Sequence, residues 1–393
     1  MSGSNEELKT LRVDHVGSLV RPAKLKEVFA RYDRAQTDER ELREAQDEAI
    51  RDVIKKQEAH GLPVPTDGEF RRHNFQESFS ASVSGFDAPP SAGTYYERHE
   101  PDVGPLERAE QDFDAVGPAI VTRRPVKERL RLARNLPLEE YGFARGIARR
   151  PVKVTLINPD RISQRFEWEA SFSVYKGLDD FVEDVVAIER RMIAALVGAG
   201  CRYIQMDAPG YTAYVDRVSL ERMRSRGEDP ERNLERAIAA DNAVIEGFAG
   251  VTFGIHICRG NARTIDPGTG RLVPQWHREG RYDAIAERIF TGLKHHRLLL
   301  EYDSERAGGF EPLAFVPKGK IAVLGLITTK ASELETPDSL KRRIEEASRH
   351  LPLAQLALSP QCGFGGLTSK TLSEDEQWRK LDRMMETAIQ VWK

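Results

Sequence analysis

The sequence predicts an α/β fold, a closed (β/α)8 barrel of the TIM type, and three features of the chain favour it. Short β-branched runs alternate with longer amphipathic patterns, which is typical of parallel βα units. Eight such runs occur in the 393 residues, and each is followed by helical material. Polar, metal-competent residues gather at the ends of these apolar runs. Barrels of this kind place their active sites at those strand ends.

The expected strands are short and apolar in their bodies. In chain order they span residues 11–18, 63–69, 152–157, 203–207, 251–257, 298–302, 321–327 and 356–359. Single barrels range from about 200 to over 400 residues once insertions are counted. We therefore expect one domain, residues 1–393.

Helical patterns separate these strands. The pattern at about 41–60 has apolar residues at helical spacing, and the one at about 178–199 stops at Gly200. Asp229-Pro230 and Thr336-Pro337 each combine an N-cap residue with proline at the first helical position. These signals predict helices reaching about 248 and 350, with further helices from about 282 and over 373–392.

Two stretches do not fit the simple alternation. Residues 75–151 are rich in Gly, Pro and Arg and are too long for a plain connection. We expect an irregular insertion after the second strand, with small hairpins or helices of its own. Residues 264–279 carry the turn sequence Asp266-Pro267-Gly268-Thr269-Gly270. This stretch suits a lid and a surface decoration equally well.

The composition excludes several classes of protein. The chain is 40% hydrophobic and 31% charged, with a formal net charge of -3, which gives no indication of nucleic acid or a membrane as partner. The N-terminus is polar, and no apolar run approaches the ~18 residues of a membrane span. We predict a cytoplasmic protein. Its three cysteines are too few and too scattered for a disulfide framework.

A metal site is predicted at the strand ends. His256 and Cys258 are two residues apart on an extended segment, so their side chains point the same way. Cys362, beyond the last strand, supplies a second sulfur, and Glu301 could supply an oxygen. Zinc accepts this mixture of ligands. Taken alone, a His-x-Cys pair is more often core packing, and Cys201, at a strand entry, is interpreted as structural.

Two sulfur ligands indicate a role other than water activation. A metal that binds an incoming thiol and releases its carboxylate ligand holds the substrate as a thiolate at neutral pH. The substrate's own sulfur is then the nucleophile, and the protein positions an alkyl donor against it. The expected partners are therefore a small-molecule thiol and an alkyl or methyl donor.

The strand-end motifs resemble the catalytic half of cobalamin-independent methionine synthase, most closely its short, single-barrel branch. They occur in the family's order at His15-Val16-Gly17-Ser18, Asp67-Gly68-Glu69-Phe70, Gln205-Met206-Asp207, His256-Ile257-Cys258-Arg259-Gly260-Asn261, Leu300-Glu301-Tyr302-Asp303 and Ser359-Pro360-Gln361-Cys362-Gly363-Phe364. The resemblance implies zinc held by His256, Cys258, Glu301 and Cys362. It also implies homocysteine recognition by Ser18, Glu69 and Asp207, and a homocysteine S-methyltransferase of methionine biosynthesis.

Three departures leave the methyl donor (folate, corrinoid or other) open. The full-length enzymes have an additional N-terminal half that these 393 residues lack. Where those enzymes carry an aspartate and a histidine after strand seven, this sequence reads Thr328-Thr329-Lys330. Lys330 is a weak candidate for the catalytic acid, since its default interpretation is a solvated lysine. Asn158-Pro159-Asp160-Arg161 lacks the tryptophan that packs the pterin.

Other functions remain as alternatives. The short branch also resembles epoxyalkane–coenzyme M transferases, in which a zinc-bound thiolate opens an epoxide, and other zinc thiol transferases on this scaffold are allowed. A sulfonate thiol would favour basic residues over Glu69 and Asp207. A related barrel family decarboxylates uroporphyrinogen but does not need His256, Cys258 and Cys362 together. A zinc sensor or storage protein is disfavoured by the buried strand-end placement. A homo-oligomer is allowed.

Overall fold

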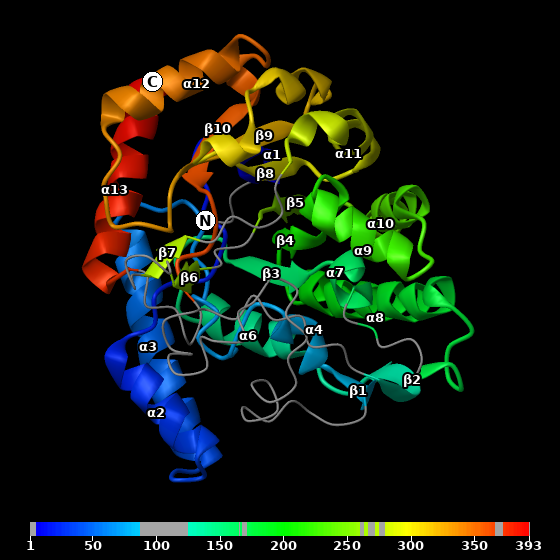
Figure 1. The fold of residues 1–393 in the computed structure, drawn as a ribbon. Helices are drawn as coiled ribbons and strands as arrows, with labels where there is room; N and C mark the ends of the chain where they lie inside the picture. Colours follow the sequence, from blue (N-terminus) through cyan, green and yellow to red (C-terminus); the bar gives the residue numbers. More distant parts are fainter. Residues whose placement is uncertain are drawn as a thin grey trace.

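A parallel sheet forms the centre of the computed structural model, which describes residues 5–86, 125–164, 166, 171–259, 263–265, 272–274, 280–365 and 372–392 (Figure 1). Six strands are hydrogen-bonded in the order β10-β9-β8-β5-β4-β3. They are β3 (Lys153–Ile157), β4 (Tyr203–Asp207), β5 (Thr252–Ile257), β8 (Arg297–Glu301), β9 (Ile321–Ile327) and β10 (Leu356–Pro360). Every residue in them is buried, as expected for a parallel sheet covered on both faces.

Two extended segments close the sheet into a barrel, although both were predicted to be strands. The first, 11–18, makes a single parallel bridge between Val13 and Leu358 of β10. The second, 63–69, contacts β3 where the amide of Lys153 donates to the carbonyl of Pro65 (3.0 Å). Prolines at 63 and 65 have no N–H to donate, so a regular ladder cannot form there. The fold class is confirmed, and these two strand assignments are wrong.

The closing segments also bind each other. Leu19 N donates to Gly68 O (3.2 Å), and the hydroxyl of Thr66 donates to Gly17 O (2.7 Å). Gly17 and Gly68 both have positive φ, +139° and +72°, so both segments bend out of the strand conformation at the site-facing end. The pair therefore forms a seam between β10 and β3.

Helices surround the sheet (Figure 1). The long ones are α2 (Ala23–Asp33), α3 (Glu39–Ala59), α6 (Leu136–Arg145), α8 (Leu178–Gly198), α10 (Pro230–Ile245), α12 (Pro337–Ser348) and α13 (Glu374–Val391). Shorter turns are α1 (Asn5–Lys9), α4 (Glu77–Ser80), α7 (Pro159–Ser163), α9 (Arg217–Ser225), α11 (Ala286–Gly292), η3 (Pro209–Tyr214), η4 (Tyr282–Ala284), η5 (Glu305–Ala307), η6 (Glu311–Phe315) and η7 (Leu353–Gln355). The predicted N-caps Asp229 and Thr336 both accept a backbone N–H. None of the described helices combines the length and apolarity needed to cross a bilayer.

Small hairpins occupy parts of the two irregular stretches. β1 (Val83–Phe86) pairs antiparallel with β2 (Val126–Leu132) within the expected insertion, as predicted. β6 (Arg263–Ile265) pairs antiparallel with β7 (Leu272–Pro274) in the stretch after β5. Residues 87–124, 266–271 and 275–279 lie outside the described part, so both interpretations of 264–279, as a lid and as a surface decoration, stay open.

A buried ionic cluster fills the barrel at the N-terminal ends of the strands. Asp14 pairs with Lys153 (2.8 Å) and Arg297 (3.1 Å), and all three side chains are fully buried. Burial alone would raise the pKa of Asp14, but the charges of Lys153 and Arg297 hold it well below its ordinary value. The cluster closes this end of the barrel, which leaves the opposite end for chemistry.

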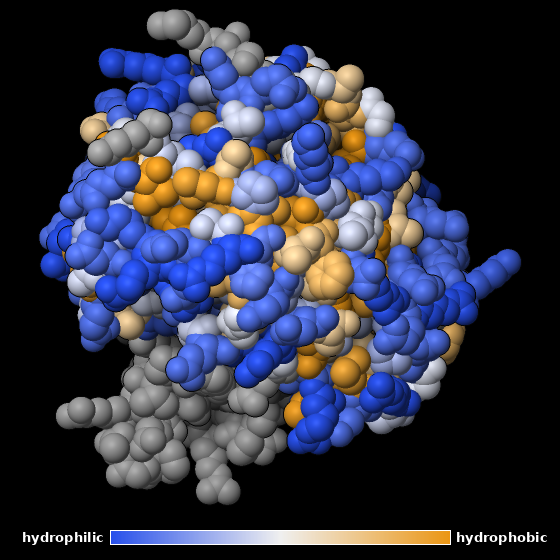
Figure 2. Space-filling model, turned by 90° about the horizontal axis from the view of Figure 1, so that it is seen from above, coloured by the Kyte–Doolittle hydropathy of each residue, from blue (hydrophilic) through white to orange (hydrophobic). Residues whose placement is uncertain are grey.

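The surface is ordinary in composition. Figure 2 shows one face on which hydrophilic residues dominate and hydrophobic ones gather in a band across the middle. Among the described residues, few large hydrophobic side chains are exposed, and Ile389 and Phe172 are the most exposed of them, at 66% and 60%. Single exposed apolar residues such as these two are normal on a globular protein.

Candidate active site

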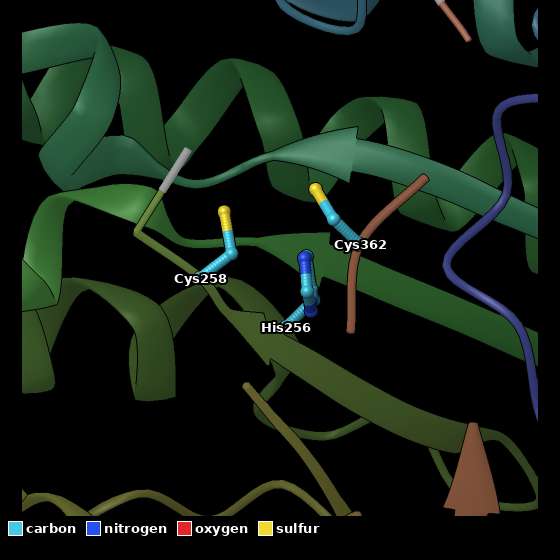
Figure 3. Close-up of side chains that lie close together, drawn as sticks. All are labelled: His256, Cys258 and Cys362. Atoms are coloured by element: carbon cyan, nitrogen blue, oxygen red, sulfur yellow. The ribbon is translucent and has the colours of Figure 1, made fainter. Parts of the chain in front are cut away.

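Three predicted metal ligands meet at the C-terminal ends of β5 and β10. His256 lies in β5, Cys258 follows that strand directly, and Cys362 comes two residues after β10. One ligand atom from each lies within 4.8 Å of the others. Figure 3 shows the imidazole and both sulfurs projecting toward one another. The alternation of side chains along β5 thus brings 256 and 258 to the same side.

The chemistry of this cluster fits a metal ion. His256 is 2% exposed, and neither ring nitrogen has a hydrogen-bond partner within the described residues. Buried imidazoles are normally hydrogen-bonded, and a missing partner indicates a ligand at the ring. One imidazole and two cysteine sulfurs are a set of ligands that zinc binds. Hydrogen bonding with Cys362 lowers the pKa of Cys258 well below its ordinary value and raises that of Cys362. A thiolate is the form of cysteine that binds metals.

Glu301, the predicted fourth ligand, lies at the end of β8 and is not one of the three clustered residues. Its Oε1 accepts from Lys330 Nζ (2.9 Å) and from Arg306 Nη2 (2.5 Å), and its Oε2 accepts from the backbone N of Arg259 (2.7 Å). Burial would raise the pKa of Glu301, but Lys330 and Arg306 lower it to about 2. Ligation by Glu301 stays a prediction.

Lys330 is not the solvated lysine of the default interpretation. Its side chain is only 14% exposed, and its Nζ lies 2.9 and 2.8 Å from the two carboxylate oxygens of Asp303 as well as contacting Glu301. Its role as an acid is untested. Arg306, which follows β8 by five residues, escaped the sequence analysis. In the sequence, the one indication of its role is that Arg306 is a basic residue shortly after the strand that ends near Glu301.

The carboxylate of Asp207 lies beside the cluster. Asp207 ends β4 and is the register partner of His256 on the neighbouring strand. The amide of Gln205 donates to Asp207 Oδ1 (2.8 Å) and so orients the carboxylate. Burial raises the pKa of Asp207 to about 7; His256 opposes this shift and the charge of Glu69 adds to it.

Glu69 reaches the site through an unusual backbone conformation. Its φ is +60°, in the left-handed region, where a non-glycine residue costs about 1–3 kcal/mol. Two contacts fix the turn: Glu69 N donates to Asp67 Oδ1 (2.9 Å), and Arg21 Nη2 donates to Glu69 O (2.8 Å). The hydroxyl of Thr155 in β3 then donates to Glu69 Oε1 (2.7 Å). Arg21 was not among the predicted site residues, because nothing in the sequence connects it to this turn.

Ser18 is held against the chain that carries Cys362. Ser18 O accepts from Phe364 N (2.9 Å), and a Cβ at Gly363 would lie 1.9 Å from Ser18 Oγ. A larger residue at 363 would therefore force the Ser18 side chain to move. Like the metal cluster, Ser18, Glu69 and Asp207 lie at the end of the barrel away from the ionic cluster, and their role in binding homocysteine stays a prediction.

Comparisons with known proteins agree with this architecture. No family model matches the chain. The uncharacterized protein YxjH of Bacillus subtilis is 34% identical over 388 residues, which cover 97% of this chain and 95% of YxjH. A methionine synthase of Pyrococcus abyssi is 25% identical over 382 residues, covering 96% of this chain and 92% of its own. The crystal structure of a putative vitamin-B12 independent methionine synthase from Listeria monocytogenes superimposes with a TM-score of 0.72 at 26% identity, covering 98% of each chain. On these similarities, which extend over nearly its whole length, the chain belongs to the cobalamin-independent methionine synthase family.

Proposed function

We propose that the protein is a zinc-dependent homocysteine S-methyltransferase. The observation that carries this proposal is the meeting of His256, Cys258 and Cys362 within 4.8 Å, next to the buried carboxylate of Asp207. The names of the Pyrococcus and Listeria proteins support the reaction class.

His256, Cys258 and Cys362 would hold the zinc. Bound zinc supplies one thing here: it makes a thiol, whose pKa is ordinarily about 8.5, available as thiolate at neutral pH. Everything else comes from side chains of this protein, which must bind the thiol, orient it and exclude water. The burial of His256 and Cys258 serves the last of these needs.

Two carboxylates would select an amino-acid thiol. Glu69 and Asp207 are 3% and 4% exposed, and an ammonium group can donate a hydrogen bond to each. Hydrogen bonds to charged groups contribute about 1.5–3 kcal/mol each. The same carboxylates repel a sulfonate, so the site disfavours coenzyme M. The hydroxyl of Ser18 and the backbone amides near it would donate hydrogen bonds to the substrate carboxylate.

X-ray absorption at the zinc edge tests the proposal. Zinc-loaded protein is incubated with homocysteine, coenzyme M or no thiol, and the number of sulfur neighbours of the metal is measured. We expect one additional sulfur with homocysteine and none with coenzyme M. Absence of the additional sulfur with homocysteine would refute the proposal.

The cysteines offer a matched control. Cys362→Ser should weaken zinc binding and abolish methyl transfer to homocysteine. Cys201→Ser should do neither, because Cys201 is buried at the entry to β4, where its sulfur donates to Tyr203 O (3.4 Å). Equal effects of the two substitutions would remove Cys362 from the metal site.

A further inference from the structure

Lys153 and Gln205 connect the ionic cluster at one end of the barrel with the carboxylate of Asp207 at the other. Lys153 lies in β3 and Gln205 in β4, which are adjacent strands of the sheet. Both side chains are buried. Lys153 Nζ donates to Gln205 Oε1 (2.9 Å), and Gln205 Nε2 donates to Asp207 Oδ1 (2.8 Å). These two hydrogen bonds make a continuous path from the ionic cluster to the predicted substrate site.

The surroundings of the Gln205 amide favour one of its two orientations. Turning the amide over exchanges its acceptor oxygen with its NH2 donors. In that orientation the donors would face the ammonium group of Lys153, and the oxygen would face the carboxylate of Asp207. The oxygen would also face the carbonyl of Val16, which now accepts from Gln205 Nε2 (2.6 Å). All three contacts would then be repulsive, so these neighbours fix the direction in which the NH2 group points.

The ammonium group of Lys153 is held just as firmly. It donates to Asp14 Oδ1 (2.8 Å) and to the carbonyl oxygen of His15, in addition to Gln205 Oε1. A lysine has three N–H donors, and these three acceptors use all of them. Burial lowers the pKa of Lys153, but the charges of Asp14 and Asp207 oppose this shift. Lys153 therefore cannot turn away from Gln205 without losing a buried hydrogen bond.

The direction of the Asp207 carboxylate matters for binding an ammonium group. A hydrogen bond weakens steeply as its angle departs from linearity, so a carboxylate free to rotate binds a donor less well than one that is fixed. Asp207 also lies close enough to Glu69 for the charge of Glu69 to act on it. The hydrogen bond from Gln205 Nε2 fixes Oδ1 and so keeps the two carboxylates in one arrangement.

We propose that Lys153 and Gln205 are positioning residues for the ammonium group of the thiol substrate. Lys153 fixes the Gln205 amide, and the amide fixes the carboxylate of Asp207 that receives the ammonium group. This inference rests on the proposed function and goes beyond it, because it makes the ionic cluster part of substrate selection. Its effect falls on the preference for a thiol that carries an amino group.

The preference for homocysteine over mercaptobutyrate, the same thiol without its amino group, measures this role. Isothermal titration of zinc-loaded protein gives the dissociation constant of each thiol, and their ratio cancels effects on the sulfur and the carboxylate. Gln205→Met preserves the size of the side chain but removes the donor. We expect it to reduce the preference about three- to tenfold, since a misdirected carboxylate loses part of a hydrogen bond between charged groups. An unchanged preference would overturn the inference.

Gln355→Met is the matched control. Gln355 directly precedes β10, at the end of the barrel away from the substrate site. Its Nε2 also donates to two acceptors, Pro317 O (2.9 Å) and Lys320 O (3.0 Å). The substitution removes as many donated hydrogen bonds, but the preference for homocysteine should stay as in the wild type. A preference reduced as much as in Gln205→Met would indicate a general loosening of the barrel, and the inference would be wrong.

Double variants test whether the three residues act in series. Gln205→Met/Asp207→Asn should show the same preference as Asp207→Asn alone, because no carboxylate remains to be oriented. Lys153→Met should reduce the preference by itself and add little to Gln205→Met. Additive reductions in either pair would mean independent effects and would overturn the inference. Because Lys153→Met also removes a partner of Asp14, the pair of Gln205 and Asp207 variants decides the matter if Lys153→Met does not fold.

The two proposals fail in different ways. Wild-type protein without any preference for homocysteine over mercaptobutyrate would contradict the proposed function. A preference that disappears in Asp207→Asn but is fully kept in Gln205→Met would contradict only the positioning role of Lys153 and Gln205.

Discussion

Gly363→Ala should impair thiol binding without dismantling the barrel. The added Cβ would lie 1.9 Å from Ser18 Oγ and 3.2 Å from Ser18 Cβ. Rotation about χ1 moves the hydroxyl away, whereas the Cβ–Cβ approach is only slightly tight. We therefore expect Ser18 to change rotamer, with a loss of unfolding free energy of about 1–2 kcal/mol for the strained contact.

The functional loss can be estimated from the same geometry. A displaced Ser18 hydroxyl loses about one hydrogen bond to the substrate, or about 0.5–1.5 kcal/mol, which corresponds to a two- to tenfold weaker affinity for homocysteine. Isothermal titration of zinc-loaded protein with homocysteine measures this value, and zinc content measured in parallel shows whether Cys362 still functions.

Ser18→Ala supplies the control for this prediction. Because both substitutions act through one hydroxyl, the double variant Ser18→Ala/Gly363→Ala should bind homocysteine about as well as Ser18→Ala alone. Additive losses, or a Gly363→Ala variant with wild-type affinity, would show that Ser18 is not the group through which Gly363 acts.

Three further predictions concern other parts of the molecule. Asp207→Asn should raise the KM for homocysteine about tenfold or more but leave binding of a thiol without an amino group unchanged; equal effects on both thiols would contradict ammonium binding. Lys153→Met should lower the free energy of unfolding in urea by about 3 kcal/mol, because it leaves the buried Asp14 carboxylate with only Arg297 as a cationic partner. A loss below about 1 kcal/mol would contradict a stabilising role of the ionic cluster. Burial lowers the pKa of His73, but hydrogen bonds to Asp33 and Glu77 raise it to about 10. Protonated His73 therefore stabilises the folded protein fully below pH 6.5, and this contribution is lost as the pH rises through about 10. His73→Gln should therefore be less stable than wild type at pH 6, by about 0.5–1 kcal/mol for a partly exposed pair, and equally stable above pH 10; a difference that persists above pH 10 would contradict this.

The regular part of the barrel could be predicted because its signals are local. A few neighbouring residues define each of these signals: the apolar runs, the N-caps such as Asp229 and Thr336, and the His-x-Cys spacing at 256 and 258. Cys362 could be added because closure of a barrel brings the ends of its strands together. These residues come from different strands, yet the topology alone places them near one another.

The remaining features depend on three-dimensional contacts. The second strand was overestimated, because Pro63 and Pro65 remove ladder donors from a run that otherwise has a strand pattern. The ion pairs of Glu301 with Arg306 and Lys330 escaped prediction, since the two cations come from the segments after two different strands and nothing in their spacing shows where the side chains point. The left-handed backbone at Glu69 is another such case, because it depends on a contact with Arg21.

The seam between β10 and β3 has a consequence for how this scaffold tolerates change. Ser18 and Glu69, the predicted homocysteine-binding residues, belong to two segments joined by a few individual hydrogen bonds, whereas the predicted metal ligands lie on or within two residues of strands of a continuous ladder. Sparse pairing lowers the free energy of local opening. We therefore expect these two segments to shift, or to accept substitutions, more readily than the ladder that holds His256, Cys258 and Cys362.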